Sequence, residues 1–193
     1  MSVIERMLGR DVGEPSGPNG LVLSPMRKRD LKDGVLETES HAYPTPWSPN
    51  VFQSEIDQVR GGSRYYLTAR RRVDGGRGRA TGPSIGHAGL WFTADEAHVT
   101  NVAVHPGARR SGVATALMVA LADEAVRREC VAWTLEVRLS STDAQEMYRK
   151  FGFVPAGVRK RYYDNVEDAI VMWCHEIGSD DYATRLNGLR EAS

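Results

Sequence analysis

The stretch "VTNVAVHPGARRSGVATALM", residues 99–118, constrains the fold more than any other part of this sequence. Its first six residues are β-rich, and the strand they predict stops before Pro106. The small residues Gly112 and Ala114 then open a long helix with a regular apolar stripe. The pattern predicts a strand that leads directly into a helix, as in a mixed α/β protein.

The junction between this strand and helix is suited to binding an anion. The first N–H groups of a helix have no partner within the helix, and the helix dipole favours negative charge beside them. Gly112 would let a phosphate approach the backbone closely, and Arg109 or Arg110 could add charge-assisted contacts. An ordinary glycine-containing helix start is the alternative, because the spacings of a Walker loop or a dinucleotide fingerprint are missing.

Periodicity elsewhere in the chain completes a mixed α/β domain around one central sheet. Ser48 is placed as the N-cap of a helix with Pro49 at its first position. Thr142 with Gln145 can form a capping box for a later helix, which Gly152 is placed to end. Strands are expected at 21–24, 64–71, 85–93, 96–105, 132–138, 154–163 and 168–175, and helices at about 30–39, 49–60, within 107–130 and 142–151.

The expected domain covers residues 21–177, with no internal repeat or linker. Residues 1–20 mix charges with glycine and proline, so we expect a flexible leader there. Residues 178–193 are polar and weakly patterned, which favours a loose C-terminal tail. Ordering of either segment against a partner is the alternative.

The composition bounds the class of protein. A chain of 193 residues that is 41% hydrophobic can bury a real core. Lys+Arg and Asp+Glu both number 25, whereas a generic nucleic-acid binder would show a basic excess, so we expect no direct nucleic-acid binding. Only Cys130 and Cys174 are present, and the histidines are scattered, so we expect reduced thiols and no metal site. No apolar run approaches the roughly 20 residues that span a bilayer, and no signal peptide is visible, so we expect a soluble, cytoplasmic protein with no membrane partner.

The stretch "TLEVRLSSTDAQEMYRKFGF", residues 134–153, places a carboxylate on a core strand and a phenol on the following helix. Glu136 and Arg138 share a face of the strand, because side chains repeat every second residue, so an ion pair between them is one interpretation. Tyr148 shares a helix face with Met147 and Phe151, so simple core packing is possible for it too.

Four blocks carry a resemblance to a known family. Arg109, Gly112 and Ala114 stand at the three defining positions of the acyl-CoA-binding motif Q/R-x-x-G-x-G/A of the GNAT superfamily of N-acetyltransferases. The blocks "YPTPWS", "LEVR" with "MYRKFGF", and "RYYDNVEDAIVM" occur in family order and resemble RimI-type protein N-terminal acetyltransferases. The resemblance covers residues 21–177 and implies a mostly antiparallel central sheet, splayed in the middle and flanked by about four helices.

The resemblance also implies acetyl-CoA as the co-substrate. Backbone atoms of Val102, Ala103 and Val104 should run along its pantetheine arm. Ser141 takes the position of an asparagine that contacts the cofactor in many members. The pyrophosphate should be cradled by Arg109, Arg110, Ser111, Gly112, Val113, Ala114 and Thr115.

Glu136 matches the family's proton acceptor and Tyr148 its proton donor. An α-amino group has a pKa of about 7.7–8.0, so roughly a tenth is free base at neutral pH, whereas a lysine amine, near 10.4, is free in fewer than about one molecule in a thousand. A carboxylate suits the milder task, and a phenol can donate a proton to the departing thiolate. Neither cysteine lies in an acyl-carrier motif, so direct transfer in a ternary complex is expected.

Aromatic residues are expected to line the substrate groove. Tyr43 and Trp47 would form one wall, with Tyr162 and Tyr163 opposite. A rigid, packed corner is the alternative for the first pair, and Trp47 is expected to be mostly core. The loop at 163–168 looks shorter than in the best-known members, which would change substrate preference.

The expected activity is therefore acetylation of the α-amino group of a protein N-terminus, with a ribosomal protein as a candidate substrate. Two alternatives stay open. The same fold could acetylate a small-molecule amine or a lysine side chain, or the protein could be an acyl-CoA-binding sensor or ribosome-associated module without catalysis.

Overall fold

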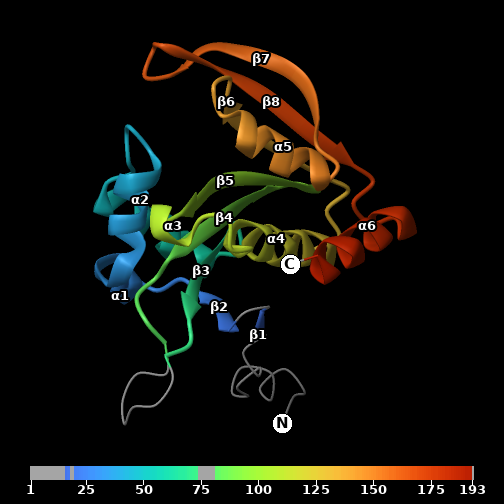
Figure 1. The fold of residues 1–193 in the computed structure, drawn as a ribbon. Helices are drawn as coiled ribbons and strands as arrows, with labels where there is room; N and C mark the ends of the chain where they lie inside the picture. The colour runs from blue at the N-terminus through green and yellow to red at the C-terminus, as the bar shows by residue number, and fades with distance from the viewer. Residues whose placement is uncertain (1–15, 18–19, 74–80, 193) are drawn as a thin grey trace.

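In a computed structural model, which describes residues 16–17, 20–73 and 81–192, a single sheet runs through the molecule with helices packed on it (Figure 1). Most of the expected leader therefore lies outside the described residues. The strands follow the order β1-β2-β3-β4-β5-β6-β8-β7. They are β1 (Ser16–Gly17), β2 (Leu21–Pro25), β3 (Arg64–Arg71), β4 (Gly86–Thr93), β5 (Glu96–Val104), β6 (Ala132–Arg138), β7 (Val154–Tyr163) and β8 (Glu167–His175).

The sheet divides between β5 and β6, which form its one parallel pair among the described strands. Residues 96–99 of β5 pair with residues 132–135 of β6, and the pairing recorded between these strands ends there. Gly89 of β4 pairs with Asn101 and Leu90 with Val99, so Thr100 is an extra residue in β5. Such a bulge bends a strand and increases its twist, which helps β5 to diverge from β6. The expected fold class, a mostly antiparallel sheet splayed in the middle, is confirmed.

Helices cover both faces of the sheet. Tyr66 and Leu67 of β3 belong to different hydrophobic clusters, because alternate side chains point to opposite faces. The larger cluster lies beneath α4 (Val113–Arg127), α5 (Thr142–Lys150) and α6 (Asp180–Glu191), and the smaller one beneath α1 (Lys28–Asp30), α2 (Leu36–Ala42) and α3 (Pro49–Val59).

The helix expected at about 30–39 is present but kinked. A π-helical turn, Leu31–Val35, separates α1 from α2. Within it Gly34 has φ of +101°, and a Cβ atom there would clash with the backbone of Ser84. Glycine is therefore required at this bend.

The capping box expected at Thr142 and Gln145 is wrong. Ser141 is the N-cap of α5, and no side-chain cap is found there among the described residues. The Gln145 side chain instead donates to the carbonyl oxygens of Arg138 and Leu139, at 3.1 and 3.0 Å. These bonds tie the helix to the end of β6.

Two other helix signals are confirmed. Ser48 Oγ accepts a hydrogen bond from the N–H of Val51 at the start of α3, with Pro49 in the first helical position. Gly152 has φ of +90° directly after α5, where a left-handed residue ends the helix.

Residues 180–191 are not the loose tail that the sequence favours, because they form α6. Ser179 caps this helix by accepting from the N–H of Tyr182. Tyr182 and Leu186 are buried in the larger cluster, and Arg190 pairs with Asp123 of α4. Buried side chains, the serine cap and the ion pair together hold this polar segment as a helix. No helix in the described part of the chain is long and apolar enough to cross a membrane.

Candidate active site

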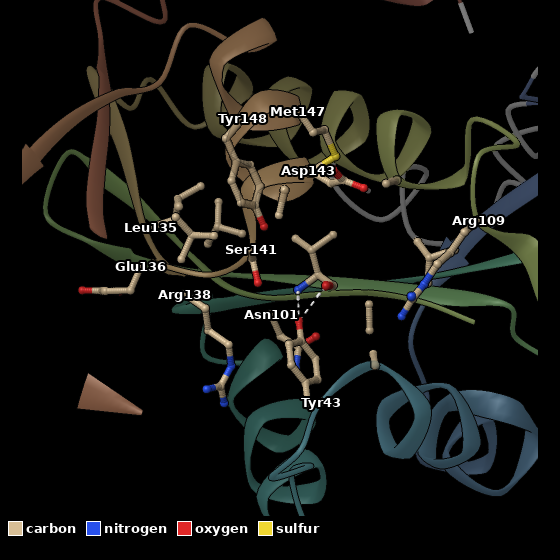
Figure 2. A pocket seen from close by; sticks show the side chains of 18 of the residues that line it. Tyr43, Asn101, Arg109, Leu135, Glu136, Arg138, Ser141, Asp143, Met147 and Tyr148 are labelled. Atoms are coloured by element: carbon tan, nitrogen blue, oxygen red, sulfur yellow. Dashed lines mark hydrogen bonds between the residues drawn. The ribbon is translucent and has the colours of Figure 1, made fainter. Parts of the chain in front are cut away.

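A cleft of about 1540 Å³ opens where β5 and β6 separate. Its walls come from the α2–α3 connection, β5, the start of α4, β6 with α5, and the β7–β8 hairpin. Every site residue expected from the sequence lines this cleft: Tyr43, Trp47, Val102, Ala103, Val104, Arg109, Arg110, Ser111, Gly112, Val113, Ala114, Thr115, Glu136, Ser141, Tyr148, Tyr162 and Tyr163. Figure 2 shows Tyr148 reaching in from one side and Tyr43 from the other.

One end of the cleft is built from backbone at the start of α4. Gly112 is the N-cap, with φ of +79°, and no side-chain cap to the helix is found within the described ranges. Ser111 Oγ donates to the carbonyl oxygen of Ala108 at 2.7 Å and accepts from Arg71 at 2.9 Å, which fixes the loop before the helix. Main-chain donors with positive dipole potential behind them suit a phosphate group.

The edge of β5 that faces β6 forms the floor of the cleft. Beyond Val99 this edge is free of strand pairing with β6. The hydroxyl of Tyr43 donates to the carbonyl oxygen of Val102 at 2.6 Å and accepts from the N–H of the same residue at 3.3 Å. The dashed lines in Figure 2 mark these two bonds.

Glu136 is the first residue of β6 after the pairing with β5 ends. Its side chain is 7% exposed, and its two oxygens lie 3.1 Å from Nε2 of His98 and 3.0 Å from a guanidinium nitrogen of Arg159. Burial would raise the pKa of Glu136, but the hydrogen bond and charge of His98, together with the charge of Arg159, lower it overall. The carboxylate is therefore held ionised at neutral pH.

The ion pair considered between Glu136 and Arg138 is not what the structure shows. Arg138 binds Glu167 at 2.9 Å, and its guanidinium lies 4.0 Å from the centre of the Tyr163 ring. Glu136 takes its partners from β5 and β7 instead. The two side chains share a strand face but belong to separate charge networks.

Tyr148 is buried on the face of the sheet that α5 covers, with its ring centre 5.9 Å from that of Phe153. Burial, together with the nearby Tyr163, raises the pKa of Tyr148 well above its ordinary value, so its hydroxyl keeps its proton. Figure 2 shows this hydroxyl directed into the cleft and the Glu136 carboxylate directed away from it. A carboxylate and a phenol therefore flank the divided sheet from its two faces.

The aromatic residues expected in the groove differ in burial. Trp47 packs on Phe52, with ring centres 5.4 Å apart, and belongs partly to the smaller cluster, as expected for a residue that is mostly core. Tyr162 is 47% exposed, and its ring meets that of Tyr163 edge-on at 5.1 Å. Tyr163 donates its hydroxyl to the carbonyl oxygen of Glu136 at 3.0 Å. Tyr162 is thus the most available of these rings.

Sequence reasoning missed the residues that hold Glu136. In the sequence His98 is one of five scattered histidines, and the bulge that follows it at Thr100 is visible only in the strand pairing. Arg159 lies in an arginine-rich run that resembles a solvated surface, so its contact with Glu136 had no local signal.

A buried carboxylate beneath the cleft was missed as well. Glu39 is 1% exposed and accepts hydrogen bonds from the side chains of His87 and Asn101. It also accepts from the backbone N–H of Trp47 at 3.0 Å. Glu39 therefore fixes the α2–α3 connection that forms one wall.

One group among the described residues has the composition of a metal site. Ligand atoms of Glu37, His41 and His105 lie within 4.8 Å of one another. Nδ1 of His105 accepts from the N–H of Gly107, so a neutral imidazole carries its proton on Nε2, the nitrogen 4.0 Å from Glu37. A proton on that nitrogen opposes metal binding, and the group is better described as a polar surface cluster.

Comparison with known proteins agrees with the geometry of the cleft. The family model described as Acetyltransferase (GNAT) family matches residues 32–153, most of the chain around the cleft. The chain belongs to this GNAT family. GNAT enzymes use acetyl-CoA as co-substrate, so this protein is an acetyl-CoA-dependent N-acetyltransferase, as the sequence predicted.

The resemblance of this GNAT enzyme to RimI-type proteins is confirmed. It is 34% identical over 140 residues to the ribosomal protein bS18-alanine N-acetyltransferase of Escherichia coli K12, covering 71% of this chain and 84% of that protein. A provisionally named enzyme of the same kind from Bacillus subtilis is 33% identical over 149 residues, covering 77% and 91%. The crystal structure of the Escherichia coli ribosomal-protein-S18-alanine N-acetyltransferase matches with a TM-score of 0.67 and 30% identity, covering 81% of this chain and 94% of that one.

Proposed function

We propose that this enzyme acetylates the α-amino group of a protein N-terminus by direct transfer from acetyl-CoA, with Glu136 as proton acceptor and Tyr148 as proton donor. The observation that carries the proposal is the placement of these two side chains. Both line one cleft from opposite faces of the divided sheet, the Tyr148 hydroxyl is directed into the cleft, and Glu136 is the first residue of β6 after its pairing with β5 ends. An amine and a thioester that meet in this gap would have the Tyr148 hydroxyl beside them, and the Glu136 carboxylate, which is directed away from the cleft, would be reached through a water molecule.

The co-substrate would lie along the free edge of β5. The proposed contacts are main-chain atoms of Val102, Ala103 and Val104 for the pantetheine arm and the loop at 109–115 for the pyrophosphate. The absence of a side-chain cap on α4, within the described residues, supports this assignment because its first N–H groups remain available to an outside acceptor. Ser141 lines the same cleft at the start of α5 and would supply a short polar contact.

Glu136 would take a proton from the incoming ammonium group, directly or through one water. Its lowered pKa means that Glu136 is ionised at neutral pH and can accept a proton, but also that it is a weak base. An α-amino group suits such a weak base, because about a tenth of it is already neutral near pH 7. A lysine amine, with a pKa near 10.4, would demand a stronger base.

Tyr148 would donate its proton to the sulfur as the thiolate leaves. Burial raises its pKa, so the phenol is fully protonated at neutral pH. The neutral amine attacks the thioester carbon, the carbon–sulfur bond breaks, and the proton from Tyr148 completes the thiol. The second proton, which the nitrogen releases as the amide forms, would return Tyr148 to its neutral state. Neither Cys130 nor Cys174, both buried, lines the cleft, which supports direct transfer rather than an acyl-cysteine.

On the acceptor side, a hydrogen bond bridges two walls of the cleft. Thr45 of the α2–α3 connection donates to Asp164 of the β7–β8 hairpin at 2.8 Å, which links the two walls. An extended chain end fits such a passage better than the side of a folded protein does. The names of the relatives point to a ribosomal protein N-terminus as the substrate class, and we propose that the enzyme acts in the cytoplasm, where ribosomal proteins are made.

A substrate panel tests this proposal. The panel contains an N-terminal bS18 peptide, the same peptide with a blocked α-amine and an added internal lysine, and spermidine. Release of free thiol from acetyl-CoA is measured for each. We expect acetylation of the first peptide only, at its N-terminal nitrogen by mass spectrometry. Faster turnover of spermidine or of the blocked peptide would contradict the assigned acceptor.

A further inference from the structure

The main-chain N–H and C=O groups of Val102 need hydrogen-bond partners that β6 does not supply. Inside a sheet the N–H and C=O groups of β5 that face β6 would pair with that strand, but pairing stops at Val99. At Val102 the hydroxyl of Tyr43 takes the place of the missing strand. It accepts from the N–H at 3.3 Å and donates to the C=O at 2.6 Å. The Val102 peptide group is half-buried, and a hydroxyl can serve it as both acceptor and donor.

The co-substrate carries the same pair of functions along its pantetheine arm, as amide N–H donors and carbonyl acceptors. An oxygen that accepts from the Val102 N–H at an ordinary distance must lie about 2.7–3.2 Å from that nitrogen. Tyr43 Oη already lies 3.3 Å away in the same gap. The hydroxyl and a co-substrate oxygen therefore compete for one position.

We propose that Tyr43 is a positioning residue that holds the Val102 peptide group in the free enzyme and yields it to acetyl-CoA. Its side chain moves when the co-substrate binds and then forms the wall of the peptide groove. The peptide consequently meets a completed groove only after acetyl-CoA has bound. This inference rests on the proposed function, because it uses the edge of β5 as the pantetheine site.

The surrounding contacts confine the movement to the Tyr43 side chain. The backbone N–H of Tyr43 donates to the carbonyl oxygen of Glu39 at 3.1 Å. The N–H of Trp47 donates to the Glu39 carboxylate, and Thr45 is linked to Asp164. With the segment held through two backbone N–H groups and the Thr45 side chain, rotation about the side-chain bonds of Tyr43 can move the ring while the loop stays in place.

Replacement of the Tyr43 hydroxyl by the co-substrate would leave the charge at Val102 unchanged. Burial raises the pKa of Tyr43 well above its ordinary value, with further contributions from Tyr148 and Glu39, so the phenol keeps its proton. A neutral hydroxyl that leaves one peptide group can be replaced by a neutral amide without a change of charge. The competition between the Tyr43 hydroxyl and the co-substrate is therefore decided by hydrogen bonding. The ratio of the coenzyme A affinities of Tyr43→Phe and the wild type should not depend on salt.

The first test measures binding without turnover. Tyr43→Phe removes the competing hydroxyl and keeps the ring, so calorimetry should show coenzyme A binding about 5-fold more tightly than to the wild type. Tyr65→Phe, which removes a phenol on β3 outside the cleft, should leave the affinity unchanged. Equal or weaker binding by Tyr43→Phe would overturn the inference, provided that its thermal unfolding matches the wild type.

The second test follows the Tyr43 ring and the Val102 amide directly. Ring-labelled tyrosine in the wild-type enzyme should show a changed Tyr43 carbon signal when coenzyme A saturates the protein, with the Tyr65 signal unmoved. The Val102 amide should exchange faster in free Tyr43→Phe than in the free wild type, and equally slowly in both when coenzyme A is bound. An unmoved Tyr43 signal at saturation would overturn the inference.

The two proposals fail in distinguishable ways. A wild-type protein that binds no coenzyme A would overturn both of them. A protein that binds coenzyme A with the expected Tyr43 response, yet acetylates no peptide, would overturn only the assigned acceptor.

Discussion

The two long walls of the cleft are built on different principles. The wall at the start of α4 presents main-chain N–H groups, arranged by the turn at Gly112. The wall at β6 presents a carboxylate, Glu136, whose partners His98 and Arg159 come from two other strands. The first wall depends on local backbone conformation, whereas the second depends on long-range packing. A change in backbone conformation should therefore damage the first wall, and removal of a single partner should alter the second by degrees.

The largest effect is expected at the backbone wall. Gly112→Glu places a negative side chain at a residue with φ of +79°, beside the proposed pyrophosphate site, so we expect acetyl-CoA affinity to fall at least about 100-fold. Gly188→Glu, at an exposed position of α6 with no neighbour within 4 Å of the added Cβ, is the matched control for charge. Calorimetric titration measures both. Tight binding by Gly112→Glu would remove the phosphate site from this wall.

Tyr148→Phe should give the next largest effect, a fall in kcat of about 100-fold with little change in KM, because in the proposed mechanism the phenol acts only on the leaving thiolate. Its raised pKa also sets the shape of the wild-type profile. A proton donor whose pKa is raised stays protonated to higher pH, so kcat should show no decline up to about pH 10. A basic limb below pH 9 that disappears in Tyr148→Phe would contradict this. Tyr65→Phe serves as the control.

Glu136→Gln should lower kcat/KM about 10-fold while the affinity for acetyl-CoA stays nearly constant. The reason is that the amide fills the same space but accepts no proton. Glu129→Gln, at an exposed position after α4, is the control. If the variant matches the wild type from pH 6 to pH 8, Glu136 is not the base.

The smallest effect is expected for His98→Ala, about 3-fold in kcat/KM at pH 7.5. The hydrogen bond and charge of His98 lower the pKa of Glu136, so their loss raises that pKa. Because more of the carboxylate is then protonated as pH falls, the ratio of variant to wild-type activity should decrease from pH 7.5 to pH 5.5. His175→Ala, an exposed histidine on β8, should show a flat ratio. A flat ratio for His98→Ala would mean that its role is only structural.

Local signals in the sequence predicted local structure well. The serine–proline start of α3, the glycine after α5 and the strand–helix junction at Gly112 are all present, because each depends on conformations of a few adjacent residues. Gln145 was misjudged for the opposite reason. Its side chain binds carbonyl oxygens at the end of β6, a partner that the capping pattern does not contain.

The C-terminal helix α6 and the partners of Glu136 could not be predicted from local sequence patterns. Helix α6 is ordered by Tyr182 and Leu186, which contribute two apolar residues to a segment that otherwise reads as polar. Arg159 and Glu136 are separated along the chain but meet because β8 brings β7 close to β6. Neither contact follows from periodicity.

The sequence by itself determined the alternation of strands and helices, the glycine turn before α4, and the presence of a carboxylate on β6 and a phenol on α5. These depend on short-range backbone preferences and on side-chain period, which are written in neighbouring residues. Only the tertiary structure decided where β5 and β6 part, which charges hold Glu136, and that Tyr43 occupies the free edge at Val102. Hydrogen-bond partners and pKa shifts arise from groups distant in the chain, so they exist only once the sheet has formed.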